Sequence, residues 1–321
     1  MRAVAVREFG AEPELIQVPK PEPEQGEVVV KIEYASLNPL DWQIADGALL
    51  SGGPGRVPPP DSPQTFPLVL GADFAGKVDV VGPGDNRFRV GDAVFGRTSG
   101  PPAGSYAEYV SVPHDGPVAF VPDGLALRDA ALLPTAGTAA AQLLDLTGVG
   151  AGDSLLVLGA AGGVGCLLTQ LAAARGVRVV AVVRGDERRR MSGLGAALTV
   201  DATVEDPAGA VRRVCPDGVD AVADLVTGTP ESFAVHAGLG RPGAVAVATR
   251  FDAGATPLAG GVAGVGFRLR PSTTLLDTLA AAAADGSLHA PVDAELPLEK
   301  APDALVQNRA GGARGKTVFA L

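Results

Sequence analysis

The sequence predicts an α/β protein of two domains, in which a barrel-like module of β-strands precedes a doubly wound parallel sheet. The chain has 321 residues, more than one hydrophobic core normally serves, and 46% of them are hydrophobic. Residues 1–121 contain short strand-like runs separated by proline and glycine. After residue 125, alanine-rich helical stretches alternate with apolar strand-like runs, a pattern typical of a parallel sheet covered by helices.

The first module is predicted from four strand-like runs. They are MRAVAVREF at 1–9, EVVVKIEYASL at 27–37, FAGKVDVVG at 74–82 and SYAEYVSVP at 105–113. Residues 48–67 are too rich in glycine and proline for a regular element, and too many for an ordinary connection in a compact domain. We interpret this segment as a lid or a cleft wall, or alternatively as a solvated connector.

The rest of the chain alternates between helix and strand. The predicted helices cover 127–133, 138–146, 164–175, 232–237 and 275–284, with one more ending at Arg309, and the predicted strands cover 155–158, 177–183, 197–200, 219–225, 244–248, 262–268 and 316–321. The last strand has no core of its own, so we expect it to return to the first module. The predicted domains are therefore 1–122 together with 271–321, and 123–270.

The run LLVLGAAGGVG at 155–165 places an apolar strand directly before a glycine-rich turn and a helix. Glycines let the backbone approach a pyrophosphate closely, while the N–H groups and the dipole of the helix face its charge. The run therefore predicts a dinucleotide-binding turn. The candidate cofactor-binding residues in it are Gly159, Ala161, Gly162, Gly163, Val164 and Gly165.

The strand after this helix is followed by Arg184. Proteins that select NAD(H) usually carry a carboxylate at this place, which binds the ribose hydroxyls. A cation suits the additional phosphate of NADP(H) instead, so we expect NADP(H). Arg188, Arg189 and Arg190 follow, and are interpreted either as a supporting phosphate clamp or as a solvated basic face. A solvated surface arginine is the alternative for Arg184, because Asp186 lies two residues on.

Composition excludes several classes of partner. The net charge is −10 and the pI is near 4.8, with no basic stripe, which argues against nucleic acid. No uninterrupted apolar stretch reaches 18 residues, and the first residues begin a strand pattern, so we expect a cytoplasmic enzyme without a membrane segment. Cys166 and Cys215 are too few for a disulfide framework.

Motifs spread over nearly the whole chain occur in the order that one family shares. They are MRAVAV at 1–6, SLNPLDW at 36–42, PLVLGADFAG at 67–76, VGPGDNRFRVGDAVFG at 81–96, GSYAEYV at 104–110, LPTAGTAA at 133–140, the glycine turn, and ARGKTVFAL at 313–321. In these motifs the chain resembles the medium-chain dehydrogenase/reductases, and within them the zinc-free quinone oxidoreductase-like branch. The resemblance implies a GroES-like substrate domain, a Rossmann cofactor domain and a cleft between them.

The zinc-binding members of this family carry a cysteine in place of SLNPLD, a His-Glu pair where this chain reads Gly71-Ala72-Asp73, and a four-cysteine lobe. None of these ligands is present, and the histidines His114, His236 and His289 are scattered without ligand spacing. We therefore expect no metal, and reduction of an already activated acceptor instead of alcohol dehydrogenation.

The resemblance implies that the enzyme transfers hydride from NADPH to a quinone or an α,β-unsaturated carbonyl compound. Asn38 is the first candidate near the nicotinamide ribose and the acceptor, with a turn asparagine before Pro39 as the alternative. Relatives often carry a tyrosine where this chain has Gln43, so solvent is expected to supply the proton. Trp42 is a candidate for stacking on a planar acceptor, or else a packing residue.

Two further cofactor contacts are expected. Thr138 belongs to the family's Gly-Thr-Ala motif and is predicted to hydrogen-bond the cofactor, with helix capping as the alternative. Arg250 follows the strand predicted at 244–248, at the edge of the sheet where ligands bind, or is a surface residue.

Other readings of the same residues remain open. One is a tailoring enoyl reductase that acts on a carrier-bound or large substrate, and the other is a non-catalytic NADPH-binding module. A homodimer is expected from the family, through the edge strand predicted at 262–268.

Overall fold

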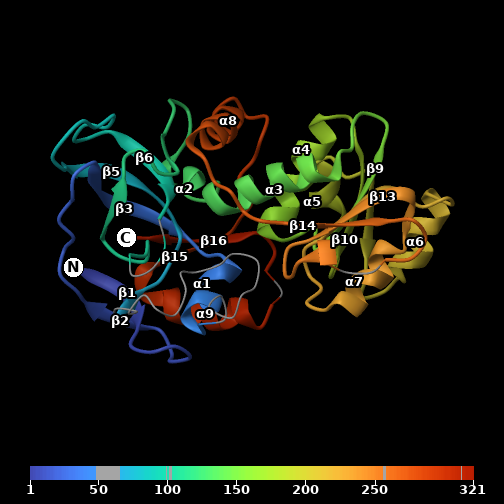
Figure 1. Ribbon diagram of the computed structural model, residues 1–321, viewed down its shortest axis with the longest axis horizontal. Helices are drawn as coiled ribbons and strands as arrows, with labels where there is room; N and C mark the ends of the chain where they lie inside the picture. The colour runs from blue at the N-terminus through green and yellow to red at the C-terminus, as the bar shows by residue number, and fades with distance from the viewer. Residues whose placement is uncertain (48–65, 99, 101–102, 256–257, 312) are drawn as a thin grey trace. The chain divides into compact units, whose positions relative to one another are not determined.

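The computed structural model describes residues 1–47, 66–98, 100, 103–255, 258–311 and 313–321, and it contains two compact units (Figure 1). Unit 1 consists of Met1–Thr138 and Arg270–Leu321, and unit 2 of Ala139–Leu269. The first boundary lies beyond the predicted residue 122 because α2 (Leu127–Ala130) packs against strands of unit 1. Residues 48–65 lie outside the described residues, so the predicted lid there stays a prediction.

Unit 1 contains two sheets and carries both ends of the chain (Figure 1). Besides α2, its elements are β1 (Arg2–Val6), β2 (Glu14–Gln17), β3 (Glu27–Ser36), α1 (Pro39–Ala45), β4 (Leu68–Val69), β5 (Asp73–Val81), β6 (Ala93–Arg97), β7 (Tyr109–Pro113), β8 (Val118–Phe120), α8 (Thr273–Ala284), β15 (Val292–Pro297), α9 (Ala301–Arg309) and β16 (Lys316–Ala320). The small sheet has the order β2-β1-β4. The large sheet has the order β15-β16-β3-β5-β6-β8, with β7 also paired to β3.

The C-terminal strand is an inner strand of the large sheet. β16 pairs antiparallel with β3, and Val318 lies opposite Ser36 in the register. The pairing buries Val318 and Phe319 completely, which the apolar pattern of the last residues requires. It also places Lys316, at the first position of β16, beside the residues that follow β3.

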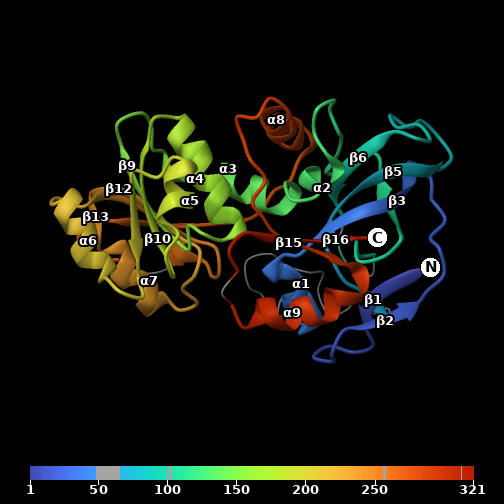
Figure 2. The ribbon, with the colours of Figure 1, turned by 180° about the vertical axis from the view of Figure 1, so that it is seen from behind.

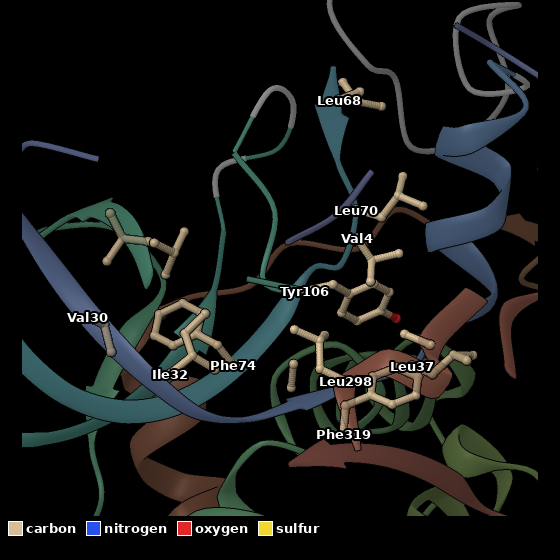
Figure 3. Close-up of a cluster of buried hydrophobic side chains, with 14 of the residues drawn as sticks. Val4, Val30, Ile32, Leu37, Leu68, Leu70, Phe74, Tyr106, Leu298 and Phe319 are labelled. Carbon is tan, nitrogen blue, oxygen red and sulfur yellow. The ribbon is translucent and has the colours of Figure 1, made fainter. Parts of the chain in front are cut away.

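The core of unit 1 is formed by buried apolar side chains of these strands. Val30 and Ile32 of β3 lie in this core (Figure 3), and Val28 and Val29 are completely buried as well, so both faces of β3 are covered there. Tyr106 lies in the same cluster, with its ring edge-to-face against Phe319 and the two ring centroids 5.1 Å apart (Figure 3). A phenol therefore sits within an otherwise apolar core.

Two helices far apart in the sequence lie side by side in unit 1. α1 packs against α9 in both views of the ribbon (Figures 1 and 2). Arg309 in α9 forms an ion pair with Asp46 at 2.8 Å, just after α1, and its guanidinium lies 5.9 Å from the ring centre of Trp42.

Unit 2 is a parallel sheet with helices on both sides (Figure 1). Its elements are β9 (Ser154–Leu158), α4 (Gly163–Ala174), β10 (Arg178–Val183), α5 (Arg188–Gly193), β11 (Leu198–Asp201), α6 (Pro207–Val214), β12 (Val219–Asp224), α7 (Pro230–Ala237), β13 (Gly240–Ala248) and β14 (Ala263–Gly266). The strand order is β11-β10-β9-β12-β13-β14, and all pairs are parallel. Every residue of β9 is buried, which explains its uninterrupted apolar run.

Two predicted elements differ from the structure. The helix predicted at 127–133 ends at Ala130, and a second helix, α3 (Pro134–Thr147), begins at Pro134 because proline disfavours helical backbone in the residue before it. The strand predicted at 262–268 is confined to Ala263–Gly266. It is the edge strand of its sheet.

Candidate functional site

The glycine turn of unit 2 connects β9 to α4, and two of its positions exclude any side chain. Gly159 has a φ of +81°, and a Cβ atom there would lie 2.5 Å from Cγ1 of Val226. A Cβ atom on Gly165 would lie 2.4 Å from the carbonyl oxygen of Gly159. Both distances are too short for carbon contacts, so the chain closes tightly here only because these residues are glycines.

The N-terminus of α4 fits an anionic group. Its N-cap residue, Gly162, has no side chain that could accept from the first turn of the helix. The N–H groups of the first turn have no partner within a helix, and the helix dipole adds positive potential at this end. The predicted residues Ala161 to Val164 form this end of the helix. The turn therefore has the local geometry that a pyrophosphate requires.

Three arginines after β10 are exposed. They are Arg184, Arg188 and Arg189, and none has an ion-pair partner among the residues that the structure describes. The nearby carboxylate of Asp201 is directed elsewhere, because it accepts from Thr203 and from the backbone N–H of Gly185 at 2.8 Å. The hydrogen bonds from Thr203 hold the pKa of Asp201 below its ordinary value. The hydrogen bond from Gly185 to Asp201 thus holds the turn that carries Arg184, while the Arg184 guanidinium remains exposed to solvent.

Arg190, next in the sequence, has a different environment. Its Nη2 lies 3.0 Å from the carbonyl oxygen of Ala161 and 2.8 Å from Sγ of Cys166, and its Nη1 lies 3.3 Å from Glu187. Arg190 therefore braces the glycine turn, a role that the sequence pattern of consecutive arginines did not separate from those of Arg188 and Arg189.

A buried carboxylate shapes the loop after β12. Asp224 is fully buried and accepts from the backbone N–H groups of Val226 and Thr227 and from Nδ1 of His236 at 2.9 Å. Burial alone would raise the pKa of Asp224, but the hydrogen bonds from His236 and Thr227 hold it below its ordinary value. Arg250 donates to the carbonyl oxygen of Val226 at 3.2 Å. Asp224 and Arg250 thus hold the loop whose Val226 lies against Gly159.

In unit 1, the predicted site residue Asn38 is 3% exposed, and both ends of its side chain are engaged. Its Nδ2 donates to Oδ2 of Asp73 at 3.0 Å and lies 3.4 Å from the carbonyl oxygen of Ser36. Its Oδ1 accepts from Nζ of Lys316 at 2.6 Å. In this arrangement the amide has no donor directed at a substrate.

Asp73 links Asn38 to the start of α3. Its Oδ1 accepts from the hydroxyl of Thr135 at 2.6 Å, and its Oδ2 from the backbone N–H of Thr135 at 3.1 Å. One turn further along α3, Thr138 is fully buried, and its hydroxyl has no hydrogen-bond partner among the described residues. An unpaired buried hydroxyl is unfavourable unless a ligand satisfies it, and the predicted cofactor contact would do so.

A second buried pair lies beneath α1. The hydroxyl of Tyr106 donates to Oδ2 of Asp41 at 2.6 Å, and the same oxygen accepts from the backbone N–H of Asn38 at 2.8 Å. Burial raises the pKa of Asp41 to about 7, despite the opposing hydrogen bond from Tyr106. Trp42 and Gln43 follow on α1 and are half-buried.

Lys316 is the only cation in this buried cluster within the described residues. Its side chain is 4% exposed, and its Nζ also donates to the carbonyl oxygen of Leu37 at 3.1 Å and lies 4.0 Å from Oδ2 of Asp73. Burial lowers the pKa of Lys316, and the charges of Asp73 and Asp41 oppose that effect.

The sequence patterns did not single out Asp73, Tyr106 and Lys316 as site residues, although all three lie in the motifs that carry the family resemblance. One signal was available, because each is a polar or charged residue inside an apolar strand-like run. Such residues are seldom buried without a partner. The identity of those partners could not be read from the runs themselves.

Two negative findings concern the described residues alone. They hold no group of three or more histidine, cysteine, aspartate or glutamate side chains arranged to bind a metal ion. Nor do they form a helix that is both long and apolar enough to span a membrane.

Comparison with known proteins identifies the family. Residues 24–123 match the model of the alcohol dehydrogenase GroES-like domain, and residues 194–319 match that of the zinc-binding dehydrogenase. The chain is 31% identical over 328 residues to a chloroplast envelope quinone oxidoreductase homolog of Arabidopsis thaliana, with 95% of this chain and 93% of the relative covered. It is 36% identical to the 2-methylene-furan-3-one reductase of Solanum lycopersicum, over 64% of this chain and 51% of the relative.

Two solved structures resemble the whole chain. An NAD-dependent alcohol dehydrogenase has a TM-score of 0.86 at 30% identity, and a mycobacterial protein complexed with NADPH has a TM-score of 0.81 at 28% identity. Each covers 100% of this chain and is itself covered over 100% of its length. With its GroES-like and Rossmann folds, the chain belongs to the medium-chain dehydrogenase/reductase superfamily, in the quinone oxidoreductase-like branch.

Proposed function

We propose that this oxidoreductase uses NADPH to reduce a quinone or an α,β-unsaturated carbonyl compound, without zinc. The observation that carries the proposal is the exposed, unpaired guanidinium of Arg184 at the end of β10, beside a glycine turn that fits a pyrophosphate. A cation at this place favours a 2′-phosphate and offers no acceptor to a ribose diol. The NADPH in the mycobacterial structure supports the same cofactor here.

NADPH supplies the hydride when bound, and the chain's own residues hold it. Ala161 to Val164 provide backbone N–H groups for the pyrophosphate, and Arg184, with Arg188 and Arg189 nearby, faces the 2′-phosphate. The hydroxyl of Thr138, which has no partner among the described residues, would donate to the cofactor. Arg250 acts through the carbonyl of Val226, holding the loop beside the glycine turn.

Reduction without a metal is supported by the residues of unit 1. At the place of the family's His-Glu pair stand Ala72 and Asp73, and both carboxylate oxygens of Asp73 already accept hydrogen bonds. An acceptor conjugated with a carbonyl needs alignment more than a Lewis acid. Two of the relatives fit such chemistry, since one is named as a quinone oxidoreductase homolog and the other as a 2-methylene-furan-3-one reductase.

For the acceptor, the candidate residues are Trp42 and Gln43 of α1. Trp42 offers a planar surface for a quinone ring, and Gln43 a polar side chain where relatives often have a tyrosine. Asn38, the remaining sequence candidate, has its amide occupied by Asp73 and Lys316, so we assign it to the support of α1. Solvent supplies the proton to the reduced acceptor.

The test is steady-state oxidation of NADPH with a panel of quinones, enones and carrier-bound enoyl thioesters, with NADH in parallel. The expected result is turnover with at least one class of acceptor and a higher kcat/KM with NADPH. Turnover confined to carrier-bound thioesters would instead favour the tailoring enoyl reductase. Tight NADPH binding with no turnover on any acceptor would favour the non-catalytic module and contradict the proposal.

We also propose that two copies pair through β14. It is one of the two edge strands of the unit 2 sheet, and an edge strand presents unpaired backbone groups to a partner. Sedimentation equilibrium should then give twice the chain mass, and Val265→Pro in the middle of β14 should shift the protein to a monomer. A wild-type monomer at all concentrations would contradict this. The cytoplasmic location stays a prediction.

A further inference from the structure

We propose that Lys316 is a positioning residue of the reductase site, which acts through Asn38 to hold α1 and the side chains of Trp42 and Gln43 in place. The activity readout of this inference rests on the proposed reductase function. Its structural readout does not, because it can be measured on the free protein.

The hydrogen bonds around Asn38 fix which end of its amide points where. Lys316 can only donate, so its Nζ at 2.6 Å requires the carbonyl end of Asn38 on its side. Asp73, as a carboxylate, can only accept, so it requires the amide nitrogen on the other side, at 3.0 Å. A donor and an acceptor on opposite sides leave Asn38 one orientation. The side chain is therefore locked by two charged groups.

The lock on Asn38 extends to α1 through the backbone. Asn38 is the N-cap residue of α1, and its N–H donates to Asp41 in the first turn of that helix. Lys316 reinforces the same junction through the carbonyl oxygen of Leu37. The start of α1 is thus held from β16, a strand that lies near the other end of the chain. Since α1 has 7 residues, a shift at its first residue moves Trp42 and Gln43 with it.

Burying an ammonium group is costly unless it is fully paired. An apolar residue at position 316 would serve the pairing of β16 with β15 equally well, since the strand needs only its backbone opposite Val292. The presence of a lysine at position 316 is explained if the groups that it contacts require its positive charge and its N–H donors. Those groups all lie at the start of α1 or are bonded to it.

The chain contains a direct reporter for this arrangement. Trp42 is its only tryptophan and lies on α1, so fluorescence excited where tyrosine does not absorb observes this helix alone. The test compares Lys316→Met with wild type, with folding checked by circular dichroism. We expect the Trp42 emission to shift to longer wavelength and acrylamide quenching to increase. With the best quinone or enone, kcat should fall about 100-fold and the acceptor KM should rise, while the KM for NADPH stays unchanged.

Two further variants separate the mechanism from general damage. Lys300→Met removes an exposed lysine that pairs only with Asp303 in the described residues, and it should leave fluorescence and activity unchanged. Lys316→Gln keeps an N–H donor for Asn38 but no charge. If Lys316 acts through its hydrogen bond to Asn38, this variant should restore most of the fluorescence signal and part of kcat. If Lys316→Met does not fold, Lys316→Gln against Lys316→Ala makes the same comparison.

A double-mutant cycle with Asn38→Ala completes the test. The combined variant Lys316→Met, Asn38→Ala should shift Trp42 emission no further than either single change, because the two residues act in one chain of contacts. Additive shifts, or unchanged fluorescence in Lys316→Met, would overturn the proposal. So would a Lys316→Gln variant as impaired as Lys316→Met, since Lys316 would then act only as a counter-charge to Asp73. If no acceptor is reduced by wild type, the proposed function fails while the fluorescence cycle still decides the role of Lys316.

Discussion

The hydroxyl of Tyr106 donates a hydrogen bond of 2.6 Å to Oδ2 of Asp41, and both side chains are fully buried. This pair lies under the first turn of α1, where burial raises the pKa of Asp41 to about 7 from its ordinary 3.8. Asp73 adds to the rise and Lys316 opposes it. Around neutral pH, the carboxyl group therefore changes between a neutral and a charged state inside the core.

The first prediction concerns pH and stability. Between pH 3.8 and about 7 the folded protein binds a proton at Asp41 that the unfolded chain has released, so the contribution of Asp41 to the free energy of unfolding falls as pH rises. Asp41→Asn keeps an acceptor for Tyr106 but cannot ionise. Urea unfolding should show the variant gaining on wild type as pH rises through this window, by about 1.4 kcal/mol for each unit of the pKa shift. Exposed Asp123→Asn is the control, and parallel profiles for wild type and Asp41→Asn would contradict the shift.

The second prediction concerns the glycine turn. Gly159→Ala forces a side chain into positive φ and within 2.5 Å of Val226, so it should lower the free energy of unfolding by about 1 to 3 kcal/mol. Gly162→Ala is the matched control, because Gly162 has a φ of −75° and its nearest neighbour would lie at 3.4 Å. Chemical denaturation of the free protein measures both. Equal losses would mean that the close approach of Val226 is unimportant.

The third prediction concerns the unpaired hydroxyl of Thr138. Thr138→Val keeps the shape and removes a buried polar group without a partner in the described residues, so the free protein should be as stable as wild type or more stable. If the hydroxyl binds the cofactor, NADPH affinity should fall by about 0.5 to 1.5 kcal/mol. Thr147→Val, which loses a 2.7 Å bond to Leu144, should show the opposite pattern. Calorimetric titration and thermal melts give the two quantities, and unchanged NADPH affinity in Thr138→Val would exclude the contact.

The fourth prediction concerns cofactor selectivity. Arg184→Ala should weaken NADPH binding by about 1.5 to 3 kcal/mol, the range for hydrogen bonds to charged groups, and leave NADH binding nearly unchanged. Arg212→Ala removes an equally exposed arginine from α6 and tests for a general effect of charge. Dissociation constants for both nucleotides decide the matter. Equal weakening of NADPH and NADH in Arg184→Ala would refute a phosphate contact.

Local patterns predicted most elements of unit 2. β9, α4 and β10 were predicted to within about two residues, because an uninterrupted apolar run and helical spacing reflect burial of the element itself. The break between α2 and α3 was predicted a few residues too late, although Pro134 marks it, since apolar residues continue on both sides. In unit 1, the strands β2, β4, β6, β8 and β15 were not predicted. Three of them, β2, β4 and β8, have only two to four residues and carry too little periodicity.

The candidate site also has features that were visible in the sequence and features that only the structure could distinguish. The glycine turn was visible in the sequence because the need for glycine arises from the chain's own close return at Gly159 and Gly165. The roles of Arg188, Arg189 and Arg190 were not separable, because adjacent arginines differ only in what lies opposite them. The structure places Arg190 against Ala161 and Cys166 and leaves the other two exposed.

By itself, the sequence determined the two kinds of unit, the glycine-rich turn between β9 and α4, and the resemblance to the family, because each depends on the character of neighbouring residues. Only the tertiary structure decided that Lys316 meets Asn38 across 278 positions, and that Tyr106 meets Asp41. The physical reason is that a buried charge or hydroxyl is acceptable only with a partner, and strand pairing in space determines which partner it meets. Because β16 pairs with β3, Lys316 lies beside Asn38, which follows β3 in the chain.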